Sequence, residues 1–78
     1  MQSYISVDAV MKTFTEDEKI QIYGLAGIMA EKGALPLKDG HQIEDLWDAL
    51  GFNHDQRIVA NKILEDAEAF YKTKKNAM

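Results

Sequence analysis

Two histidines lie among carboxylates in the second half of the chain, and this is where side chains that bind metals are densest. His41 precedes Glu44 and Asp45 by one helical turn, so the three side chains would share one face of a helix. Such a turn could hold a metal ion with His54 as a further ligand. The chain offers only two histidines and no cysteine as ligands, and the same carboxylates are typical of an ordinary solvated helix. We therefore expect no metal site, no cofactor and an exposed His41.

Residue patterns that support catalysis are missing from the sequence. It has no cysteine nucleophile, no nucleophile beside a base, and no glycine-rich phosphate loop that follows a strand. A chain of 78 residues also has little room for a concave site lined by convergent polar groups. The sequence predicts a protein that is not an enzyme.

The range 42–63 is similar to the helix-turn-helix motif of DNA-binding proteins. Leu46 is followed four residues later by a Leu-Gly pair, and Asn53 then caps a second helix with apolar spacing. The resemblance implies that the second helix lies in a DNA groove, where side chains near its start would contact base edges. The expected contact residues are Gln56, Arg57 and Asn61. A DNA-binding transcriptional regulator is therefore the alternative function.

The distribution of charge favours a protein partner over DNA. The net charge is −4 and the isoelectric point is near 5.0, so the surface repels phosphates. Glu44, Asp45 and Asp48 lie on the first helix of the corner, and Asp55 begins the second, where a DNA phosphate would lie. The sequence predicts that this acidic face, with Phe52 as an apolar neighbour, binds another protein that has a basic surface. Nucleic acid is a partner only in the alternative.

The order of helix, loop and helix from Thr15 to Gly51 is also similar in outline to half of an EF-hand domain. A calcium loop needs oxygen ligands at alternating positions and a glycine at its sixth. Leu35, Pro36 and Leu37 stand in the middle of this loop instead. The resemblance therefore concerns helical geometry alone.

Large apolar residues are more numerous than a core of this size hides easily. The residues concerned are Tyr4, Ile5, Met29, Trp47, Phe52 and Tyr71. We expect Trp47 in the core. Apolar surface left over from the others would suit a protein contact, including a homodimer.

The elements that position these residues are helices, and the fold class is all-α: a small bundle of four helices, the first one short, with a helix-turn-helix-like corner. Apolar periodicity and capping residues predict helices at 7–14, 16–32, 40–50 and 54–74 in one domain, 1–78. The expected N-caps are Ser6, Thr15, Asp39 and Asn53, and the expected helix stops are Gly33 and Gly51. The helix 16–32 should be the central, most buried one.

Two glycines inside the expected helix 16–32 lower its intrinsic stability. Gly24 and Gly27 predict a place where another helix approaches the backbone closely. The connector that follows should tuck Leu35 and Leu37 under the domain.

The sequence gives no sign of membrane insertion or export. No apolar run is long enough to cross a bilayer, and the first residues lack a basic region followed by an apolar one. We expect a cytoplasmic protein.

Overall fold

The computed structural model describes residues 6–76 and contains four α-helices, with no strand in that range. They are α1 (Val7–Met11), α2 (Glu16–Lys32), α3 (Ile43–Leu50) and α4 (His54–Asn76). The all-α class with a short first helix is confirmed. Tyr4 and Ile5, two of the apolar residues considered above, lie outside the described residues.

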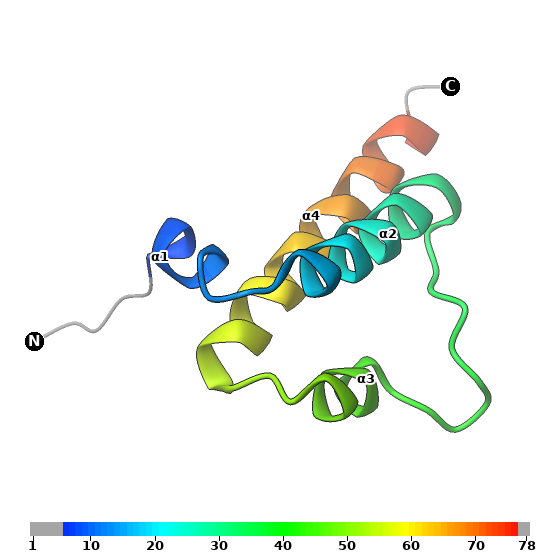
Figure 1. The fold of residues 1–78 in the computed structure, drawn as a ribbon. Helices are drawn as coiled ribbons and strands as arrows, with labels where there is room; N and C mark the ends of the chain where they lie inside the picture. Colours follow the sequence, from blue (N-terminus) through cyan, green and yellow to red (C-terminus); the bar gives the residue numbers. More distant parts are fainter. Residues whose placement is uncertain (1–5, 77–78) are drawn as a thin grey trace, which may run out of the picture.

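The two long helices, α2 and α4, pack side by side and form the body of the molecule. Both run in the same direction, away from α1 (Figure 1). Parallel neighbours need a connection that returns to the starting end, and here the segment 33–42 together with α3 provides it. The carboxyl ends of the pair lie together, because Gly33 is in close contact with the ring of Tyr71.

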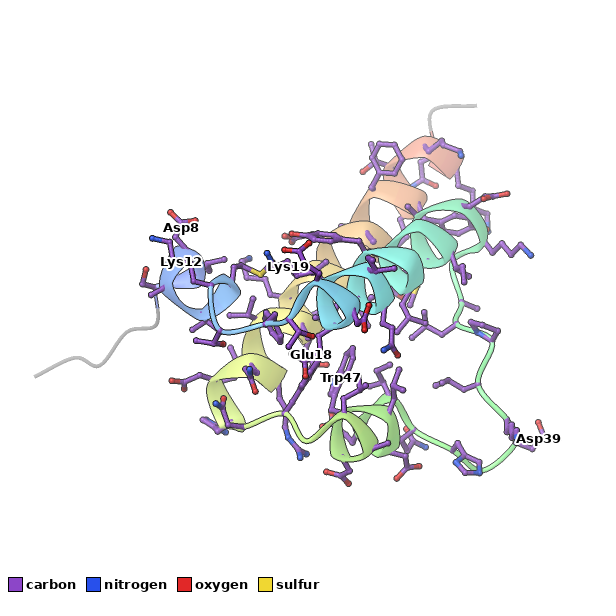
Figure 2. The ribbon with its side chains drawn as sticks, viewed as in Figure 1. Asp8, Lys12, Glu18, Lys19, Asp39 and Trp47 are labelled. Carbon is purple, nitrogen blue, oxygen red and sulfur yellow. The ribbon has the colours of Figure 1, made fainter. Side chains whose placement is uncertain are left out.

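The core lies where α1, α3 and the corner before α4 meet the start of the long pair. Its buried members are Val10, Phe14, Ile22, Trp47, Phe52, Val59, Ala60 and Leu64. Trp47 points from α3 toward α2 and α4 and is fully buried, as expected (Figure 2). The Phe52 ring stacks on the Trp47 ring with centroids 5.2 Å apart. The Phe14 ring meets the Phe52 ring edge-on, with centroids 5.0 Å apart. This aromatic cluster joins segments that are far apart in the sequence.

Side-chain caps fix the starts of three helices. The Ser6 hydroxyl accepts a 3.3 Å hydrogen bond at the start of α1. At α2, Thr15 and Glu18 form a reciprocal capping box, in which the Glu18 N–H donates to Thr15 and the Thr15 N–H donates to Glu18. Asn53 and Gln56 form the same reciprocal pair at α4, with both bonds at 2.9 Å. These caps confirm three of the four expected helix starts.

The start of α3 differs from the expectation. Asp39 does not cap a helix that begins at residue 40; it belongs to a turn, and Gln42 is the N-cap. Gly40 has φ 81°, a left-handed conformation that an α-helix cannot contain. The helix therefore begins only after this turn, where the Asp45 carboxylate accepts a 2.9 Å bond from the Gln42 N–H. The expected helix ends at Gly33 and Gly51 are both present.

Within the described part of the chain, no helix makes the close crossing expected at Gly24 and Gly27. A methyl group placed at either position would meet nothing within 4 Å. The same side of α2 exposes Ile20 and Tyr23, at 66% and 53% of their full accessible area. α2 is also not the most buried helix, since Ile22 is its one fully buried residue while α4 contributes three. The physical reason is that α4 covers one side of α2, while among residues 6–76 no other helix packs extensively on the opposite side.

The connector after α2 is packed only in part. Leu35 lies half-buried against the core, as expected, but Leu37 is 37% exposed.

Candidate functional site

The four acidic residues predicted to bind a partner are all exposed. Glu44, Asp45 and Asp48 lie on one face of α3 because they are spaced by a helical turn. Asp55 lies in the first turn of α4, on the other arm of the corner. We call these four residues the acidic corner.

Two carboxylates of the acidic corner already have partners within the fold. The Asp48 carboxylate forms a 2.6 Å ion pair with Nη2 of Arg57. The Asp45 carboxylate caps α3 and lies 3.6 Å from Nδ1 of His41. Glu44 and Asp55 make no hydrogen bond or ion pair with any described side chain, so their charges face solvent.

Phe52 does not lie beside the acidic corner as an accessible apolar group. Its side chain is 3% exposed, because it fills the space between Phe14 and Trp47. The exposed apolar side chain on this arm is Ile58 instead, at 40%. Ile58 follows Asp55 by three residues and so lies on the same side of α4. This spacing is visible in the sequence, but the apolar periodicity also fits a core position.

The three residues of the DNA-binding alternative all make contacts inside the protein. The Gln56 amide group donates a 3.0 Å bond to the Thr13 hydroxyl, besides its role in the α4 cap. The Arg57 guanidinium donates to the Phe52 carbonyl at 3.0 Å and pairs with Asp48. These groups would have to leave their internal partners before they could contact base edges.

Asn61, the third of these residues, serves the core. Its Oδ1 accepts a 2.7 Å hydrogen bond from Nε1 of the buried Trp47. A buried indole N–H needs such an acceptor, so this contact alone explains an asparagine at position 61. The helix-turn-helix interpretation stays a prediction.

The histidines are not brought together. His41 is exposed in the connector before α3, and His54 is exposed as the first residue of α4. Among residues 6–76, no three histidine, aspartate or glutamate side chains are grouped as a metal ion would require.

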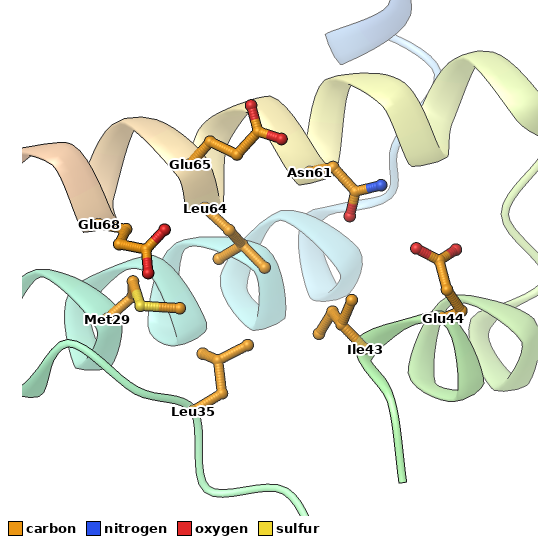
Figure 3. A pocket seen from close by; sticks show the side chains of 8 residues that line it. All are labelled: Met29, Leu35, Ile43, Glu44, Asn61, Leu64, Glu65 and Glu68. Carbon is orange, nitrogen blue, oxygen red and sulfur yellow. The ribbon is translucent and has the colours of Figure 1, made fainter.

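A pocket that the sequence did not indicate lies beside the acidic corner (Figure 3). Its volume is about 300 Å³, and α2, α3, α4 and the connector all contribute to its wall. The lining residues, which we call the acidic groove, are Met29, Leu35, Ile43, Glu44, Asn61, Leu64, Glu65 and Glu68. They come from four separate segments, so no local spacing rule could have assembled them.

The fold and these surfaces define a small all-α protein with an acidic corner and an adjoining acidic groove. Comparison of the chain with protein-family models, curated proteins and solved structures finds no match. In the part of the chain that the structure describes, no helix combines the length and the apolar character needed to cross a membrane.

Proposed function

We propose that the protein is a non-enzymatic interaction module, an adaptor or inhibitor, that binds a basic surface of another protein through its acidic corner. One observation carries the proposal: Glu44 and Asp55, which have no ion-pair partner among residues 6–76, project from the two arms of a corner that internal contacts hold in place. Charges with no internal role are available to a partner, whereas those of Asp45 and Asp48 are partly used.

Internal contacts that hold the two arms of the corner support this proposal. Trp47 anchors α3 in the core, and the Asp48 to Arg57 ion pair ties α3 to the first turns of α4. A surface that is already ordered loses less conformational entropy when a partner binds. The acidic corner would first attract a basic surface through long-range charge, and burial of Ile58 would then add apolar contact.

The test is charge reversal at the two unpaired residues of the corner. Glu44→Lys and Asp55→Lys leave the Asp45 cap and the Asp48 ion pair intact. The matched control is Asp17→Lys with Glu31→Lys, which makes the same change in net charge on exposed α2 residues. Asp17, like Asp55, lies in the first turn of its helix.

Affinity capture from a lysate of the native cells, quantified by mass spectrometry, would compare the three proteins. We expect a partner that the wild type and the control retain and that the Glu44/Asp55 variant loses. Equal capture by all three proteins would refute the acidic corner as the binding surface. Circular dichroism of each variant verifies that the helices are intact.

A further inference from the structure

We propose that the acidic groove receives a lysine or arginine side chain from a basic, partly apolar segment of the partner protein. This inference rests on the proposed function, because Glu44 belongs both to the acidic corner and to the groove. It adds a specific anchor to an otherwise general attraction between charges.

The floor of the groove is apolar. Met29, Leu35 and Ile43 are half-buried and Leu64 is buried. These side chains come from α2, the connector, α3 and α4, so the floor is a product of the tertiary fold. The volume, about 300 Å³, is enough for one long side chain. An aliphatic stem in this space would replace water on four apolar side chains.

The rim of the groove is acidic, and no lysine or arginine is among the described residues that line it. In Figure 3, Glu68 on α4 points toward Met29 and Glu44 stands on α3, while Glu65 lines the groove from α4 with its carboxylate turned outward. None of the three carboxylates has an ion-pair partner among residues 6–76, although Glu68 is half-buried. The Glu68 and Glu44 carboxylates are therefore available to a positive charge from a partner.

Asn61 places an unused hydrogen-bond donor at the edge of the groove. Its Oδ1 accepts a 2.7 Å hydrogen bond from the Trp47 indole. This contact distinguishes the amide oxygen from the amide nitrogen, because only the oxygen can accept. The amide nitrogen makes no hydrogen bond with the described residues and is not sealed from solvent. A backbone carbonyl of a bound segment is an acceptor suited to this nitrogen.

Lysine and arginine match this combination better than other groups. Their methylene stems lie on apolar surface while the charged head reaches solvent or a carboxylate, and the peptide backbone supplies a carbonyl for Asn61. A phosphate or other anion would be repelled by the three carboxylates. A purely apolar group would fill the floor but leave those carboxylates partly desolvated without a partner, which is unfavourable.

The experiment is a titration of the ¹⁵N-labelled protein, followed by NMR, with a capped synthetic peptide in which leucines alternate with arginines. Three proteins are compared: wild type, the Glu65→Gln/Glu68→Gln variant, and the control Asp17→Asn/Glu31→Gln, which loses two charges elsewhere. We expect shifts at Leu35 and Ile43, and a Kd about five- to tenfold weaker for the Glu65/Glu68 variant than for the control.

A second peptide, with glutamate in place of arginine, should not bind. Free arginine amide tests the other source of the same cation, and binding as tight as that of the peptide would refute a polypeptide partner. Equal affinity of the Glu65/Glu68 variant and the control would refute the groove. Given that equal affinity, weaker peptide binding by the Glu44→Lys/Asp55→Lys variant would support the acidic corner without the groove. Unchanged peptide binding by this variant as well would refute both proposals.

Discussion

Trp47 and Asn61 form a hydrogen bond of 2.7 Å that joins the middle of α3 to the second turn of α4. The bond satisfies the indole of a fully buried side chain, and Asn61 also lines the groove. One asparagine thus supports both the core and a candidate binding surface.

Replacement of Asn61 by alanine should destabilise the protein by about 1–3 kcal/mol, because the buried indole N–H loses its acceptor. Urea unfolding followed by circular dichroism measures this change. The same substitution in a Trp47→Phe background should cost clearly less, since no buried N–H remains. Equal costs in the two backgrounds would show that the hydrogen bond contributes nothing.

Removal of the α2 cap by Thr15→Ala should lower stability by about 1 kcal/mol, because the Glu18 N–H loses the hydroxyl that accepts from it. In a domain of this size such a loss lowers Tm by about 4–8 °C. Thr73→Ala, at an exposed position inside α4, is the control and should leave Tm nearly unchanged or slightly higher. A similar Tm for both variants would contradict the role of the capping box.

Alanine at Gly24 or Gly27 should stabilise the protein by about 0.5–1 kcal/mol each, because both lie in an exposed helix interior with open space around them. Gly33→Ala should have the opposite effect. Its φ of 75° is left-handed, and a Cβ there would lie 2.5 Å from the Tyr71 ring. Thermal melts of the three variants decide the point. A loss of stability at Gly24 or Gly27 would indicate that something packs against them, including a second copy of the chain.

Random duplex DNA should not bind at low salt, because the acidic corner repels phosphate and Arg57 is held by Asp48 and by the Phe52 carbonyl. A fluorescence titration with labelled DNA measures this. Binding that weakens with added salt and is lost on Arg57→Ala would favour the helix-turn-helix alternative instead.

Local features of the fold were readable from the sequence, whereas the features that depend on distant contacts were not. The capping pairs at Thr15 and Asn53 lie within one helical turn, so residue type and spacing predict them. The burial of Phe52 depends on Phe14, which is far away in the chain. The open surface at Gly24 could not be predicted either, because a glycine allows a close neighbour without supplying one.

In the candidate site, too, the sequence predicts the local features but not those that depend on tertiary contacts. The spacing of Glu44, Asp45 and Asp48 predicts one exposed helix face, and the structure has it. The three carboxylates differ in their availability to a partner because of tertiary contacts. Only the structure shows that Asp48 forms an ion pair with Arg57, whereas Glu44 has no ion-pair partner among residues 6–76. The groove formed by Glu44 with α4 residues depends on the same arrangement.

The parallel course of α2 and α4 has an electrical consequence. Both amino ends carry acidic first turns, at Glu16, Asp17, Glu18 and Asp55, and both carboxyl ends carry lysines, at Lys32, Lys74 and Lys75. These charges offset the partial charges of two aligned helix dipoles, which would otherwise repel each other side by side. They also give the two ends of this helix pair opposite signs, with acidic first turns at a negative pole and lysines at a positive pole. In the field of a cationic surface the protein would rotate as it diffuses, and its negative pole would arrive first.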